Sequence, residues 1–355
     1  MIDRRALLAA GGASLILPRF TLTARAQSPM SADEKAAAID ALYQAAQEEG
    51  ELTWYVAHVG SEVAELMGAK FTETYPGVEV NVVRTTAQVA FQRLNQDLQA
   101  GVNNCDVFAS TVVAHFLDLK ERGLLMAYEP ARKLDALPQF QAIDPDNMFH
   151  TTSIGPVCIV YNTDAVSEAD APKNWDDLLD PKWTGQVAVG HPGYSGQVGN
   201  WVVVMRDLYG WEYFETLAER DPYIGRSIID VTTTIVSGER QVGAGPMATT
   251  LRSQAAGNPV AVTYPTDGTV VVTAPSGIMK DAQHPNAAKL FIEFLLGPEN
   301  TQIAIDEWNP PIIPGVEAKA GVADLGEIKT LSATNDQLIN GIPEVSEMWR
   351  DLFGI

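Results

Sequence analysis

The sequence predicts an α/β fold divided into two domains of ordinary size. Strand-like and helix-like segments alternate along the chain at spacings typical of strand–helix–strand units. Such units use right-handed crossovers, so we expect parallel sheets with helices on both faces. Residues 27–355 are more than one hydrophobic core usually organises, and no flexible linker marks a boundary between the domains.

The first 26 residues have the features of an export signal. Arg4 and Arg5 precede an apolar run at 6–17, and an A-x-A cleavage pattern ends at Ala26. This run is too short to cross a hydrocarbon core of about 30 Å, so a retained membrane helix is the weaker alternative. The paired arginines also fit a twin-arginine signal, and the choice between the two export routes stays open. We therefore expect the protein to act outside the cytoplasm.

The first half of the chain predicts four helices and three strands. Ser31 and Glu34 form a capping-box pattern ahead of an alanine-rich helix that ends near Gly50. The following elements are a strand at 52–57, a helix at 62–74, a strand at 78–83, a helix at 86–100, a strand at 106–109 and a helix at 112–122. This order predicts that the first domain is α/β.

The second half predicts another α/β unit and two final helices. Its elements are strands at 157–161 and 186–189, helices near 197–209 and 247–256, and a strand pair at 260–264 and 269–273. His284 and Pro285 open a helix that continues to 296, and a second helix runs from there to Trp308. Prolines at 310, 311 and 314 end it.

The chain is acidic, with a formal charge of −21 at pH 7. An acidic surface repels nucleic-acid phosphates and anionic lipid, and no Lys/Arg cluster is interleaved with aromatic residues. We therefore expect neither nucleic acid nor direct membrane insertion, and solubility is the ordinary explanation of the charge.

The cysteines and histidines do not form a metal-binding pattern. Cys105 and Cys158 are too few for a disulfide framework and stand in apolar, strand-like contexts that favour buried thiols, although a bridge between them stays open. The five histidines show no H-E-x-x-H motif, and the chain has neither a Walker A motif nor a G-x-G-x-x-G fingerprint. We expect no metal and no cofactor.

Polar residues follow each of the first three predicted strands. They are His58 after the first strand, Thr85 and Thr86 after the second, and Ser110 and Thr111 after the third. Ligands of open parallel sheets bind beyond these strand ends, where helix N-termini supply N–H donors and a partial positive charge. Ser and Thr are also ordinary N-caps, so any single residue has a structural explanation. Together they predict a site for a small anionic or polyhydroxylated ligand.

The loop at 190–196 adds a second candidate segment. Tyr194 can stack on a ligand, and Ser195 can act both as a helix cap and as a hydrogen-bond donor. A serine hydrolase using Ser195 is the alternative from another class of protein. Its G-x-S-x-G elbow is incomplete, because Gln197 stands where the last glycine is required.

Several further stretches carry a resemblance to a known family. They are Leu52 to Tyr55, Phe71 to Gly77, Cys105 to Ser110, Gly123 to Tyr128, Val160 to Thr163, Asn174 to Leu178, Pro181 to Gly185, Ser237 to Glu239, Tyr264 to Gly268 and Asn286 to Leu295. In this order the chain resembles the type II periplasmic solute-binding proteins of ATP-driven importers. The similar branch contains binders of ferric iron, thiamine, phosphonates and phosphosugars.

The resemblance implies a two-lobed fold, with a sheet flanked by helices in each lobe and a hinge between them. Residues 27–140 and 275–320 would form lobe one, and residues 141–274 and 321–355 would form lobe two. The protein would be a periplasmic monomer that holds its ligand in the interlobe cleft and closes to dock on a membrane permease. It would bind and deliver a solute, without catalysis.

The resemblance also bears on the ligand. Ferric-iron members carry two adjacent tyrosines in the segment that corresponds to 243–252, and this chain has Thr249, Thr250 and Arg252 there instead. Threonine hydroxyls do not ionise to replace phenolate ligands of a trivalent cation. We therefore expect a carboxylate, phosphonate or phosphate ester. The alternative is ferric iron held by His58 and Tyr194 with an exogenous anion.

Overall fold

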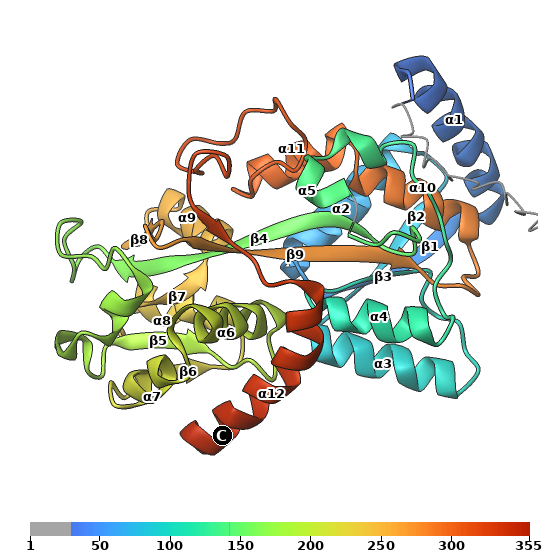
Figure 1. Cartoon of the computed structure of the whole chain (residues 1–355). Coiled ribbons are helices and arrows are strands. Elements are labelled where there is room, and N and C mark those ends of the chain that lie inside the picture. Colours follow the sequence, from blue (N-terminus) through green and yellow to red (C-terminus); the bar gives the residue numbers. More distant parts are fainter. Residues whose placement is uncertain (1–29, 142) are drawn as a thin grey trace, which may run out of the picture.

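The computed structural model describes residues 30–141 and 143–355 and shows two lobes side by side (Figure 1). The predicted export signal at 1–26 lies outside the described residues. One curved sheet runs through both lobes in the strand order β2-β1-β3-β9-β4-β7-β5-β6, with β10 paired to β9 and β8 paired to β4. The two-lobed α/β architecture that the sequence implied is confirmed.

Lobe one is built from the first strand–helix repeats. Its elements are α1 (Ala32–Glu49), β1 (Glu51–Val56), α2 (Ser61–Thr74), β2 (Glu79–Arg84), α3 (Ala87–Gln99), β3 (Val107–Ala109) and α4 (Val113–Glu121). The predicted capping box at Ser31 and Glu34 is present, and Gly50 ends α1 in the left-handed conformation (φ 78°). β1 pairs in parallel with β2 and β3, as predicted.

Two long antiparallel strands join the lobes. After α5 (Pro138–Gln141), β4 (His150–Asn162) pairs with β9 (Thr269–Ile278) from His150 opposite Ser276 to Val157 opposite Val270. The end of β9 pairs with β3 in lobe one. The end of β4 pairs with β7 (Val242–Pro246) in lobe two. The expectation of purely parallel sheets is therefore wrong at this junction, because both crossing strands run against their neighbours.

Lobe two repeats the alternation of strands and helices. Its elements are β5 (Val187–Gly190), α6 (Gly196–Tyr209), α7 (Glu212–Ala218), β6 (Tyr223–Gly225), α8 (Ile228–Val236), β7, α9 (Met247–Ala255) and β8 (Val260–Thr263). The predicted pairing of 260–264 with 269–273 is wrong. β8 and β9 both pair with β4 and follow one another along the same edge of that strand.

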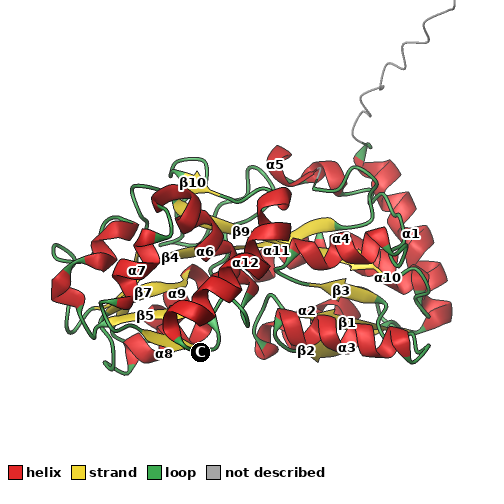
Figure 2. Ribbon diagram, turned by 60° about the horizontal axis from the view of Figure 1, so that its bottom comes forward, coloured by secondary structure: helices red, strands yellow, loops and turns green. Residues whose placement is uncertain are grey.

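The last elements return to both lobes. They are α10 (Pro285–Leu295), α11 (Pro298–Asp306), β10 (Thr330–Leu331) and α12 (Asn335–Phe353). α10 packs against α1 in lobe one, whereas α12 packs against α6 of lobe two and also contacts α4 of lobe one. The views in Figures 1 and 2 both place α12 beside the junction of the lobes.

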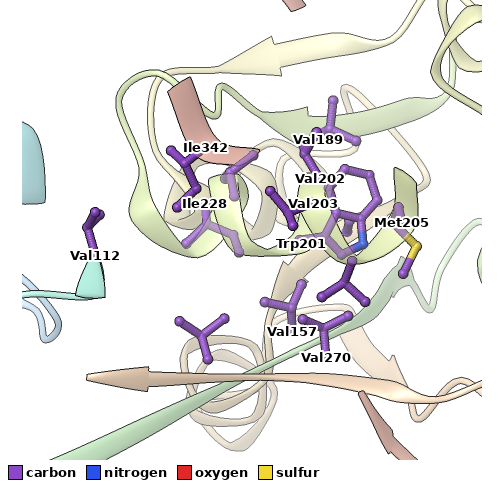
Figure 3. Close-up of a cluster of buried hydrophobic side chains, with 14 of the residues drawn as sticks. Val112, Val157, Val189, Trp201, Val202, Val203, Met205, Ile228, Val270 and Ile342 are labelled. Carbon is purple, nitrogen blue, oxygen red and sulfur yellow. The ribbon is translucent and has the colours of Figure 1, made fainter. Parts of the chain in front are cut away.

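Two large apolar cores hold the lobes. One contains Trp54, Phe71 and Phe291 in lobe one, with ring centroids about 5 Å apart. The other spans the junction, where Trp201 of α6 lies among Val157, Val270 and other apolar side chains (Figure 3). Burying a side chain of this size contributes roughly 1.5–3 kcal/mol. Trp201 is thus a core residue and does not line a cleft.

The two cysteines are buried and unbridged. Cys105 donates its thiol to the carbonyl of Val107, and Cys158 lies in a small apolar cluster with Met247 and Leu251. Burial raises the pKa of both thiols. Across 30–141 and 143–355, no helix has both the length and the apolar character needed to cross a bilayer.

Candidate ligand-binding site

A cavity of about 90 Å³ lies where the lobes meet, at the ends of strands from both of them. Water-sized spheres need about 10–15 Å³ each, so the cavity accommodates several waters or a small solute. Seven of the predicted site residues line it: His58, Thr86, Thr111, Tyr194, Ser195, Thr249 and Arg252. Segments far apart in the sequence are thereby brought to one place, as expected for the carboxyl ends of sheet strands.

The other three predicted residues lie outside the lining. Ser110 is fully buried, and its Oγ lies 3.0 Å from Nδ1 of His115. Thr250 is fully buried and donates its hydroxyl to the carbonyl of Pro246 at 2.8 Å. Thr85 donates its backbone N–H to the carbonyl of Val56, 3.1 Å away. In each case the neighbouring threonine in the chain lines the cavity instead, because adjacent side chains point in different directions.

Helix N-termini from both lobes meet at this cavity. α2 and α3 contribute from lobe one, and α6 and α9 from lobe two. Their N-cap residues are Gly60, Thr86, Ser195 and Pro246, and none of these side chains caps its own helix. The first N–H groups of a helix have no partner within the helix, and its dipole places partial positive charge there. The cavity wall therefore offers donors suited to an anion.

α8 shows by contrast how an N-terminus at this cavity is satisfied internally. Its N-cap Ser227 accepts a hydrogen bond from the backbone of Ile229, and Asp230 accepts one from the backbone of Ser227. This reciprocal arrangement is a capping box. α8 is thus capped at the cavity, whereas α2, α3, α6 and α9 have no side-chain cap there.

Arg84, the last residue of β2, supplies a formal positive charge to the cavity. Its Nε donates to the carbonyl of Val59 at 2.8 Å, and its guanidinium forms no ion pair with any described carboxylate. Burial lowers the pKa of Arg84, yet a guanidinium remains protonated at neutral pH. Arg84 was not among the predicted site residues, although it stands at the same strand end as Thr85.

Arg252 differs from Arg84 because its charge is already paired. Its Nη1 donates to Oε2 of Glu307 at 2.6 Å, and both residues line the cavity. This pair is close to neutral as a unit. Arg84 therefore supplies the positive charge in the cavity that an anionic ligand can neutralise.

His58 has an unusual environment on the cavity wall. Both of its ring nitrogens are buried and have no hydrogen-bond partner among the described residues, and its ring lies edge-on to Trp54 at 6.0 Å between centroids. Burial, helped by the charge of Arg84, lowers the pKa of His58 to about 4. The imidazole is thus neutral at pH 7, with donor and acceptor atoms that the protein leaves unused.

Tyr194 and Ser195 both line the cavity. Tyr194 is 47% exposed, and its ring centroid lies 4.7 Å from the ring of His191 and 5.2 Å from the guanidinium carbon of Arg226. No histidine within the described part of the chain hydrogen-bonds to Ser195 Oγ. The base that a serine nucleophile requires is thus not in place.

The lobes touch directly beside the cavity. Asn200 of α6 donates its amide to the carbonyl of Thr111 at 3.3 Å, and Gly196 faces the same segment of lobe one. A Cβ at Gly196 would collide with Thr111 Oγ1 and would lie 2.6 Å from a methyl group of Val112. Only glycine allows the start of α6 to approach lobe one this closely.

The cavity provides few ligands for a metal ion. Among residues 30–141 and 143–355, no group of three or more His, Cys, Asp or Glu side chains is arranged to hold one. Glu307 is paired with Arg252, and Tyr194 is the tyrosine of the lining. A hard trivalent cation needs several anionic oxygens, which these side chains do not supply.

The chain belongs to a family of bacterial extracellular solute-binding proteins, whose model matches residues 103–335. Iron uptake protein A1 of Synechocystis is 26% identical over 290 residues, which are 76% of this chain and 78% of that protein. An uncharacterized protein of Haemophilus influenzae is 25% identical over 193 residues, and the match spans 52% of this chain and 56% of that relative.

Solved structures show the same fold. The periplasmic binding protein AfuA from Actinobacillus pleuropneumoniae, with exogenous fructose-6-phosphate bound, has a TM-score of 0.77 at 22% identity and covers 86% of this chain and 99% of its own. Iron-bound HitA from Pseudomonas aeruginosa has a TM-score of 0.73 at 19% identity, covering 85% and 99%. The type II periplasmic-binding fold that the sequence resemblance implied is confirmed.

Because α6 approaches lobe one so closely at Gly196, we predict that adding a single methyl group there moves the two lobes apart. We expect Gly196→Ala to increase the radius of gyration in solution scattering without ligand, because Thr111 and Val112 must move away from the added Cβ. Gly60→Ala is the matched control, since a Cβ there meets no atom within 4 Å. Superimposable scattering curves for Gly196→Ala and wild type would contradict this account of the interlobe contact.

The environment of His58 predicts a pH-dependent stability. The native imidazole stays neutral down to about pH 4, whereas the unfolded chain takes up a proton near 6.5. The unfolded state binds more protons in this range, so wild type should lose stability relative to His58→Asn as the pH falls from about 6.5 to about 4. Urea unfolding of both proteins at several pH values measures this difference. A constant difference across the range would show that His58 is not desolvated.

Proposed function

We propose that the protein is the periplasmic receptor of an ATP-driven importer and that it captures a small organic anion between its lobes. Carboxylates, phosphonates and phosphate esters are the ligand classes that the site favours. The observation that carries the proposal is the meeting of four helix N-termini without side-chain caps, two from each lobe, beside the guanidinium of Arg84, which has no carboxylate partner among the described residues.

Each part of the site has a role in this proposal. Backbone N–H groups and the hydroxyls of Thr86 and Ser195 would donate to the anion, and Arg84 would compensate its charge. Because the donors come from both lobes, the ligand would stabilise the closed arrangement. The closed protein, acting as a monomer, would then dock on a membrane permease and release the solute.

Ferric iron is the second candidate, because the Synechocystis relative is called an iron uptake protein and HitA was solved with iron bound. His58 and Tyr194 both line the cavity and could contribute to such a site. An unpaired Arg84 beside a trivalent cation would be repulsive, which favours the anion. A hydrolase is disfavoured, since Ser195 has neither a histidine partner nor the complete elbow motif.

Calorimetric titration of the protein without residues 1–26 tests the proposal. We expect submicromolar binding of at least one compound from a panel of carboxylates, phosphonates and sugar phosphates. Arg84→Gln should weaken that binding roughly 10- to 100-fold, the range for losing a hydrogen bond to a charged group.

Arg93→Gln is the matched control for Arg84→Gln. It removes the same charge from an exposed position on α3, where Arg93 lies over the ring of Tyr55 and away from the cavity. The ligand affinity of Arg93→Gln should stay within about twofold of wild type, a much smaller change than the one expected for Arg84→Gln. Red-brown protein with stoichiometric iron and no affinity for the panel would overturn the anion proposal in favour of iron.

A further inference from the structure

A second, smaller cavity of about 30 Å³ adjoins the candidate site. Val59, Val63, Ser153, Ile154 and Asn309 line both cavities, so the two share one wall. The smaller cavity, called the recess below, lies in lobe one between α2, α11 and the residues that follow α11. Figure 1 shows α11 beside α2, and the two helices are in contact.

The recess presents apolar surface. Beyond the shared residues, Met67, Leu295, Ile303, Ala304, Pro310 and Ile312 contribute to its lining. Within 30–141 and 143–355, no Asp, Glu, Lys or Arg lines it. It thus differs in chemistry from the main cavity, where Arg84, Arg252 and Glu307 stand.

Three polar side chains that line the recess but not the main cavity each make a hydrogen bond within the protein. Thr152 Oγ1 lies 2.7 Å from Ser276 Oγ, Asn300 donates to the carbonyl of Leu295 at 2.8 Å, and Thr301 donates to the carbonyl of Gly297 at 2.9 Å. Ser153 and Asn309, by contrast, stand at the wall shared with the main cavity. A group that enters the recess therefore meets mainly apolar surface.

We propose that the ligand is an anion with a short apolar end, and that the recess binds this end while the helix starts bind the charge. This inference rests on the proposed function and narrows its ligand class. A volume of about 30 Å³ holds two or three water-sized groups, which corresponds to an alkyl chain of two or three carbons. Burying each methylene should raise affinity about fourfold.

The absence of acidic residues from the recess lining also gives a selectivity. An ammonium group placed there would lose its hydration without gaining a counter-ion. Propylphosphonate and 2-aminoethylphosphonate have nearly the same shape and differ in this terminal group. We expect the protein to bind propylphosphonate at least about tenfold more tightly, because burying a charged group without a partner costs more free energy than a tenfold change in affinity represents.

The test is calorimetric titration with methyl-, ethyl-, propyl- and hexylphosphonate. Affinity should rise about fourfold per methylene up to propylphosphonate and fall for hexylphosphonate, which the recess cannot hold. Ala304→Leu, which fills the recess from α11, should abolish the gain from methyl- to propylphosphonate. Gln302→Leu is the matched control on the same helix, because its exposed side chain lies outside the recess, and it should keep the gain.

The outcomes separate this inference from the proposed function. Equal affinities along the wild-type series, tighter binding of 2-aminoethylphosphonate, or a gain that survives in Ala304→Leu would overturn the recess as an apolar subsite. Binding of sugar phosphates without binding of any alkylphosphonate would also overturn it, but the proposal of an anion receptor would still hold. Failure to bind any anion would overturn both. If Ala304→Leu does not fold, the affinities of wild type for the four alkylphosphonates still test whether the recess is an apolar subsite.

Discussion

The antiparallel pairing of β4 with β9 is the constraint on which the rest of the structure depends. These strands run from one lobe to the other, and each continues into the sheet of the lobe it reaches. Their hydrogen bonds fix how the two sets of strand ends face each other. Because helices begin just beyond those ends, the same pairing brings α2 and α3 opposite α6 and α9. The position of the cavity therefore follows from the strand topology, and particular side chains determine its chemical character.

The chemical character of the cavity is mainly electrostatic. Away from the cavity, side chains cap some of the helix starts, as Ser31 and Glu34 do for α1 and Thr334 and Gln337 do for α12. At the cavity the protein leaves several starts without side-chain caps, and it places an unpaired guanidinium beside them. The partial charges of the helix starts and the full charge of Arg84 both attract an anion there. An acidic protein can thus hold a local site of opposite character.

The sequence predicted local structure well and long-range pairing poorly. Strand–helix alternation located α1 through α4 within a few residues, because each helix carries its own apolar period. It did not reveal that β8 and β9 both pair with β4, since partner choice depends on distant residues. It also missed α12, whose interior Pro343 argues against a helix until packing on α6 is known. Likewise it predicted Thr86 and Thr249 as site residues but could not say which of two adjacent threonines lines the cavity.

The most direct test of the account follows backbone amides by nuclear magnetic resonance while inorganic phosphate or another bound anion is added. The account predicts that the amide protons of the first residues of α3, α6 and α9 move downfield together, with the same concentration dependence, because one anion accepts hydrogen bonds from both lobes. Amide shifts confined to one lobe, or shifts around Arg84 with none at the helix starts, would contradict it.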